Sequence, residues 1–129
     1  MKTQSRKQAR RTAMFLLYQW DLTGQPLASL YEGDVDPWAR DLAETVAARA
    51  AELDGRIDEA AVGWPADRLG AVERNVLRIA IHELTTHSVP TGVAIDEAVR
   101  LAKRYASEDA GRLVNGILDR IARDEEETS

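Results

Sequence analysis

The fold class is decided by residues 72–105, which read VERNVLRIAIHELTTHSVPTGVAIDEAVRLAKRY. Apolar residues recur three and four positions apart in two long runs of this stretch, which is the period of one helical face. Between the runs, Ser88-Val89-Pro90 forces a turn, and Thr91 is expected to cap the second helix. The stretch therefore predicts two helices, the first ending near His87.

The N-terminal half has the same helical period. A first helix is expected over residues 8–22, and Thr23-Gly24-Gln25-Pro26 ends it, because glycine favours a helix stop and proline cannot continue a helix. An alanine-rich run over residues 37–62 predicts a long second helix. Asp36 is its expected cap, and Gly55 is a point at which this helix could break.

A last helix is expected after Ser107, whose side chain is predicted to cap it. The apolar period continues through Asn115-Gly116, so this dipeptide lies in a helix and not in a hairpin turn. A glycine inside a helix needs a reason: close helix packing is favoured here over a surface kept open for a ligand. The acidic tail, residues 124–129, is expected to fray. These patterns together predict a compact all-α bundle.

The composition bounds the function classes. The chain has 129 residues, 44% of them apolar, which suits one domain with an ordinary core. The absence of cysteine excludes disulfides, thiolate metal sites and a cysteine nucleophile. No apolar run is long enough to span a membrane, and no secretory signal follows the basic N-terminus. We therefore expect a soluble, cytoplasmic protein with no membrane partner.

The charge is unevenly distributed along the chain. The first twenty residues hold five basic side chains and no acid, whereas the remainder holds twelve basic and twenty-two acidic ones, so +5 and −10 give the net charge of −5. A basic arm on an acidic body indicates a localised contact with a polyanion. Charge alone leaves a solubilising N-terminal tail as an equal alternative.

The sequence around two histidines resembles the zinc-binding helix of a metalloprotease at first sight. His82 and His87 stand five positions apart, whereas that motif needs a spacing of four, so the two rings point to different faces of the helix. No other histidine or cysteine is present to complete a metal site. Glycine-rich phosphate loops and nucleophile elbows are also absent from the sequence. We expect no catalysis, no metal and no cofactor.

Several short motifs follow one another in a specific order. They are residues 17–20 (LYQW) after the basic helix start, 72–80 (VERNVLRIA) with 83–84 (EL), 89–90 (VP) with 93–98 (VAIDEA), 102–109 (AKRYASED) and 114–119 (VNGILD). Each motif is weak alone, but the ordered set strongly resembles the NusB family of bacterial transcription antitermination factors. The resemblance covers nearly the whole chain and is best over residues 68–121.

The resemblance implies a fold, a function and partners. It implies one all-helical domain of two small packed subdomains, about residues 1–64 and 65–124, followed by the tail at 124–129. It also implies binding to boxA RNA, a single-stranded element in the leader of ribosomal RNA transcripts. Binding would occur together with NusE, a small-subunit ribosomal protein, within a transcription elongation complex that resists termination. It implies no catalytic step and no cofactor.

The resemblance also implies which residues bind. The family's arginine-rich start, which would bind RNA phosphates, falls on Lys2, Arg6, Lys7 and Arg10. The second wall of the RNA site falls on the last helix at Arg112, Asn115 and Asp119. The positions that would face NusE fall on Tyr18 and Glu83.

Two other functions compete with RNA binding. A helical protein-interaction module with an incidental basic arm would show no preference for one RNA sequence over a scrambled one. Binding of duplex DNA through the turn after His87 is disfavoured, because the helix that follows has its cationic residues only late, at Arg100, Lys103 and Arg104. The sequence leaves open whether the chain forms a homodimer.

Overall fold

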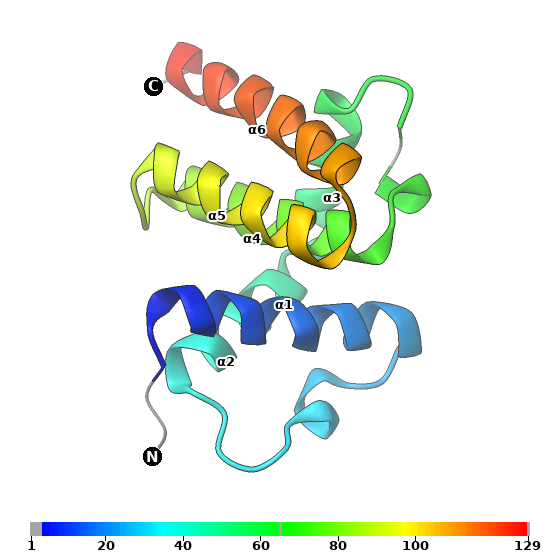
Figure 1. Cartoon of the computed structure of the whole chain (residues 1–129), viewed down its shortest axis with the longest axis vertical. Coiled ribbons are helices and arrows are strands. Elements are labelled where there is room, and N and C mark those ends of the chain that lie inside the picture. The colour runs from blue at the N-terminus through cyan, green and yellow to red at the C-terminus, as the bar shows by residue number, and fades with distance from the viewer. Residues whose placement is uncertain (1–3, 65, 129) are drawn as a thin grey trace. The chain divides into compact units, whose positions relative to one another are not determined.

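The computed structural model describes residues 4–64 and 66–128, and these residues form helices and connecting segments without a strand (Figure 1). The predicted all-α fold class is confirmed. The elements in chain order are α1 (Arg6–Thr23), η1 (Leu27–Leu30), α2 (Pro37–Ala48), α3 (Ala50–Ala60), η2 (Ala66–Arg68), α4 (Ala71–Thr86), α5 (Thr91–Tyr105) and α6 (Glu108–Thr128).

The chain divides into two compact units, Met1–Arg49 and Ala50–Ser129. The expected subdomain boundary near residue 64 lies after α3, whereas this division lies before it. The reason is that α3 packs against α4 and α6, so its apolar face belongs to the second unit. The first unit contains α1, η1 and α2, and the second contains α3 to α6.

The long helix expected over residues 37–62 is two helices, and they separate at Arg49 rather than at Gly55. The apolar spacing continues across the break and therefore could not reveal it. Leu42 of α2 is buried in the first unit, while Leu53 of α3 is buried in the second. Gly55 lies within α3, where an added Cβ would meet no neighbour. One periodic run thus supplies two different cores.

The helix ends in the first unit follow the sequence signals closely. Ser5 and Gln8 form a capping box at the start of α1, in which the Gln8 N–H donates to the Ser5 hydroxyl at 3.1 Å. Gly24 ends α1 in the left-handed region at φ 70°, as expected for a glycine stop. Asp36 caps α2, and Pro37 occupies its first turn.

In the second unit, α5 packs against both α4 and α6 (Figure 1). The predicted cap Ser107 is confirmed, because its hydroxyl accepts the Ala110 N–H at 3.0 Å. The prediction for Thr91 is wrong: Pro90 occupies the cap position and Thr91 is the first helical residue. The Pro90 carbonyl accepts the first backbone hydrogen bonds of α5, from Val93 and Ala94. No side-chain cap forms there, because the proline ring has no hydrogen-bond acceptor.

Two further expectations about α6 are corrected by the structure. The tail was expected to fray, but α6 continues to Thr128, and the Arg56–Glu125 ion pair at 2.9 Å ties this last part to α3. Ser129 lies outside the described residues. Gly116 was expected to serve close packing, yet an added Cβ would meet nothing within 4 Å. The close approach occurs at Gly111, where a Cβ would stand 2.5 Å from Lys103 Cγ on α5.

Candidate functional site

The first turn of α1 is cationic. Arg6 and Lys7 are exposed there, and the turn contains no acidic residue. The N-terminal end of a helix carries a partial positive charge, so cations at this position are unfavourable by about 0.3–1 kcal/mol each. An anion bound at the same place would reverse that penalty, because the side chains, the dipole and the free backbone N–H groups all attract it.

The ring of Trp38, at the start of α2, lies against two arginines of α1, Arg6 and Arg10. The Arg6 guanidinium carbon lies 4.5 Å from the centre of the Trp38 ring, and that of Arg10 lies 5.3 Å from it. A cation over an indole face is attracted by the electron-rich ring. We call Arg6, Lys7 and Arg10 the α1 basic cluster. Trp38 therefore orders Arg6 and Arg10 without neutralising their charge.

Asp36 accepts hydrogen bonds from two parts of the chain, the segment before α1 and the first turn of α2. Its Oδ1 accepts the N–H groups of Trp38 at 3.0 Å and Ala39 at 3.1 Å, and its Oδ2 accepts the Gln4 N–H at 2.8 Å. The hydrogen bond from Gln4 is the largest cause that lowers the Asp36 pKa below its usual value, followed by that from Ala39, with a smaller contribution from the positive charge of Arg6. The carboxylate thus joins the approach to α1 to the start of α2.

The predicted phosphate-binding residues differ in how far they are exposed to solvent. Arg6 and Lys7 are exposed, but Arg10 is only 4% exposed. The expectation that Arg10 presents its charge at the surface is therefore not met, because its guanidinium lies against Trp38. Lys2 lies outside the described residues.

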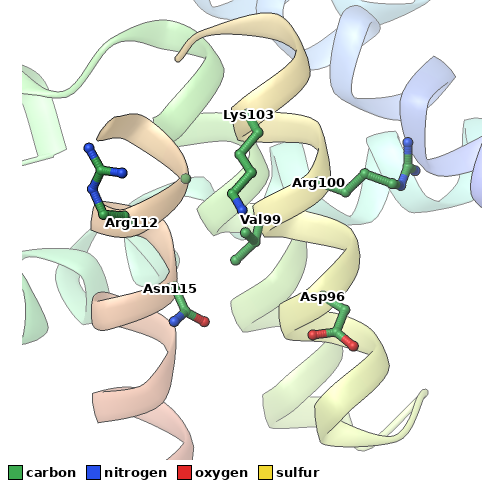
Figure 2. Close-up of a pocket in the computed structure, with 7 residues that line it drawn as sticks. Asp96, Val99, Arg100, Lys103, Arg112 and Asn115 are labelled. Carbon is green, nitrogen blue, oxygen red and sulfur yellow. The ribbon is translucent and has the colours of Figure 1, made fainter. Parts of the chain in front are cut away.

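A groove of about 450 Å³ lies between α5 and α6 in the second unit. It contains two of the residues predicted on the last helix, Arg112 and Asn115. Figure 2 shows Asn115 pointing toward α5, whereas Arg112 and Arg100 extend to opposite sides. The full lining is Asp96, Val99, Arg100, Lys103, Gly111, Arg112 and Asn115.

The charges of this groove are partly compensated. Arg100 donates two hydrogen bonds to Glu97, from Nε at 3.0 Å and from a terminal nitrogen at 2.6 Å. Arg112 pairs with Asp109 one turn earlier on α6, and Lys103 approaches Glu108 at 3.9 Å. The groove therefore attracts an anion less strongly than the first turn of α1.

The remaining predicted residues lie in different environments. Asp119 is exposed on α6, and Tyr18 is half-buried on α1. Glu83, on α4, is only 2% exposed. Glu83 is predicted to face a partner, but its side chain is almost completely buried in this structure.

Residues 4–64 and 66–128 contain neither a metal-binding cluster nor a membrane-spanning helix. No group of three or more His, Cys, Asp or Glu side chains in these ranges could hold a metal ion. His87 ends α4 with φ 53°, and His82 lies within that helix. None of the described helices has the length and apolar character needed to cross a bilayer.

Sequence reasoning missed Trp38 and the α5 side of the groove. No local signal in the sequence marked Trp38, because its place over Arg6 and Arg10 depends on how α1 packs on α2. Lys103 was noted only as a late cation on α5. Its place beside Gly111 depends on how α5 packs on α6, which no local pattern encodes.

Comparison with known proteins decides the family. The family model described as "NusB family" matches residues 7–123, which is most of the chain. The chain belongs to the NusB family. The resemblance deduced from the ordered motifs is thereby confirmed. A curated relative, the transcription antitermination protein NusB of Solibacter usitatus (strain Ellin6076), is 37% identical over 131 residues, covering 93% of this chain and 90% of its own.

Solved NusB structures share the fold. NusB of T. maritima superposes with a TM-score of 0.83 at 32% identity, covering 95% of this chain and 94% of that one. A chain from the crystal structure of the antitermination factors NusB and NusE in complex with dsRNA gives a TM-score of 0.80 at 35% identity, covering 92% of this chain and 96% of that one. The all-helical fold is thus that of the family.

Proposed function

We propose that this protein is a transcription antitermination factor that binds boxA RNA of ribosomal RNA transcripts together with NusE. It acts in the cytoplasm within the elongation complex, without catalysing a reaction. The observation that carries the proposal is the α1 basic cluster, whose exposed Arg6 and Lys7 stand at a helix N-terminus with no acid in the first turn. Membership of the NusB family supports it, as does a NusB relative bound to NusE and dsRNA.

The RNA contacts are proposed in two groups. Arg6 and Lys7 bind backbone phosphates, Arg10 positions Arg6 through their shared contact with Trp38, and Lys2 adds charge ahead of the helix. Arg112, Asn115 and Asp119 of α6 form a second set that reads base edges, and Arg112 also binds the adjacent phosphate. We propose that both units belong to one functional domain, and the family model, which extends across both, supports this.

NusE is proposed to bind the α1 surface around Tyr18. Phe15, Tyr18 and Leu22 are spaced three and four residues apart, so they form one stripe along α1. Phe15 is 40% exposed and Leu22 is 58% exposed, so this stripe offers large apolar side chains that a partner protein can cover. Glu83, which is 2% exposed on α4, is the other position that we propose to face NusE.

The protein-interaction module remains the second candidate, and the exposed stripe of Phe15, Tyr18 and Leu22 is the observation that favours it. In that case NusE or another protein would bind this stripe, and RNA would bind only weakly through its charge. The two candidates differ in RNA sequence preference, which phosphate contacts alone cannot provide.

Fluorescence anisotropy tests the proposal. A boxA-like RNA and a scrambled RNA are titrated with the protein, each as a single strand and as a duplex, with and without NusE, over a salt series. We expect selective binding of the boxA-like single strand that tightens when NusE is added. Equal, weak and salt-sensitive binding to every RNA, unaffected by NusE, would contradict the proposal and favour the protein-interaction module.

A further inference from the structure

A second groove, of about 440 Å³, lies in the second unit between the end of α3 and the face of α6. We call it the Trp64 groove. It shares Arg112 with the groove of Figure 2 but has otherwise different walls. Its lining is Ala60, Ala61, Val62, Trp64, Arg112, Leu113, Gly116, Ile117, Arg120 and Arg123.

Trp64 stands at this groove with 52% of its surface exposed, and Val62 beside it is also exposed. The segment that presents the indole is held by specific hydrogen bonds. The Trp64 N–H donates to the Ala61 carbonyl at 2.9 Å, the Ala66 N–H donates to Asp58 Oδ1 at 2.7 Å, and Gly63 makes the turn at φ 83°. The backbone N–H groups of Trp64 and Ala66 are therefore both anchored at or near the end of α3.

The α6 wall of the groove is cationic. Arg112, Arg120 and Arg123 all line it, whereas its lining residues include no acid. Gly116 lies between them on the same helix face, and a Cβ there would meet nothing within 4 Å. Because packing does not require this glycine, its effect is to keep the floor of the groove open.

We propose that the Trp64 groove binds one unpaired base of the RNA strand. The indole of Trp64 stacks on the base, and Arg120 and Arg123 bind the flanking phosphates. An aromatic platform beside a positively charged groove is the usual arrangement for binding single strands. The inference rests on the proposed RNA-binding function and adds a specific base-stacking residue in the second unit.

Charge and continuity favour RNA over a protein segment as the occupant. An acidic peptide would satisfy the arginines but has no need of an exposed flat ring. Arg112 lines both this groove and the one between α5 and α6, so a strand that leaves one can enter the other. The bases of a duplex are paired and stacked, so none is free to stack on Trp64. Comparing single-stranded with duplex RNA is therefore a control for this proposal.

The test uses the full chain and a single-stranded boxA-like RNA extended by several nucleotides at both ends. Binding is followed by RNA anisotropy and by tryptophan fluorescence in wild type, Trp64→Ala and Trp64→Phe. We expect Trp64→Ala to weaken binding about tenfold, Trp64→Phe to restore most of it, and the wild-type quenching on binding to fall in both. Val93→Ala, which also removes an exposed apolar side chain, should change neither signal.

The outcomes separate this inference from the function on which it rests. Trp64→Ala could have the melting temperature, RNA affinity and fluorescence quenching of wild type. In that case the Trp64 groove does not bind RNA, while the proposed function stands. If Trp64→Ala impairs only NusE binding, the inference is overturned in favour of a protein occupant. Quenching that persists after the complementary strand is annealed would also overturn it. If wild type itself shows no preference for the boxA-like RNA, the proposed function fails first.

Discussion

The α1 basic cluster in the first unit and the α6 surface in the second differ in how their positive charge is held. At the start of α1, Arg6 and Lys7 have no acid in their own turn, and the aromatic ring of Trp38 holds Arg6. Backbone hydrogen bonds are the main cause that lowers the Asp36 pKa, and Arg6 makes only the smallest contribution. On α6, Arg112 pairs with Asp109 one turn away. An aromatic support leaves the cation's charge available to an anion, whereas an ion pair offsets it.

This difference indicates a division of labour. The α1 basic cluster is suited to sequence-independent attraction of phosphates, which is strong and sensitive to salt. The α6 surface offers the mixed chemistry that can distinguish bases, with an amide at Asn115, a carboxylate at Asp119 and an indole nearby at Trp64. We therefore expect α1 variants to alter affinity for all RNAs and α6 variants to alter the preference among them.

The largest effect is expected from the double variant Arg6→Ala/Lys7→Ala. Loss of two phosphate contacts should weaken RNA binding by about tenfold and reduce the slope of log affinity against log salt by about 1.4. Anisotropy over a salt series measures both. Arg40→Ala/Arg104→Ala removes the same charge from exposed positions on α2 and α5, and it should leave the slope near that of wild type. Equal losses in the two double variants would remove the special role of α1.

A matched pair of glycine variants distinguishes an open groove from ordinary helix surface. Gly55→Ala in α3 and Gly116→Ala in α6 both add a methyl group where nothing lies within 4 Å. Each should stabilise its helix by about 1 kcal/mol, seen as a melting temperature about 4 °C higher. Only Gly116→Ala should also weaken binding of the boxA-like RNA, because only Gly116 lines the Trp64 groove. Identical RNA binding by both variants would show that the methyl does not meet the RNA.

How much the sequence could predict differs between these surfaces. The basic cluster was predictable because charge asymmetry and a helical period are local properties of the chain. The grooves beside α6 were not, because they depend on which helices pack together. Gly111 and Gly116 look alike in the sequence, yet one is pressed against Lys103 and the other faces open space. The break between α2 and α3 at Arg49 was not predictable either, because the apolar residues keep one helical spacing across it although the two helices belong to different units.

A smaller effect is expected from Arg112→Ala. Its charge is already offset by Asp109, so affinity for the boxA-like RNA should fall by only about threefold, an ordinary effect for one screened surface contact. The ratio of boxA-like to scrambled affinity should fall with it, since Arg112 lies beside the base-reading side chains. Competition between the two RNAs measures this ratio. A uniform loss for both RNAs would assign Arg112 to backbone binding alone.

The smallest effect concerns acid stability in the first unit. The folded-state pKa of Asp36 lies below its unfolded value, so the charged cap stabilises the fold above about pH 4 and this contribution is lost as the pH falls through the folded pKa. Asp36→Asn keeps a capping oxygen but cannot titrate. The difference in melting temperature between wild type and Asp36→Asn should therefore shrink on going from pH 7 to pH 3. A difference that stays constant would show that the charge of Asp36 does not stabilise the fold.

Hydrogen exchange of the full chain with and without a single-stranded boxA-like RNA, in the presence of NusE, tests the central claim most directly. The account predicts that RNA slows exchange at two separate places in the sequence, the start of α1 around Arg6 and the part of α6 from Arg112 to Arg123. NusE alone should slow exchange around Tyr18 instead. Protection by RNA that is confined to α1, or that is equal for a scrambled RNA, would contradict the claim that the start of α1 and α6 both take part in selective RNA binding.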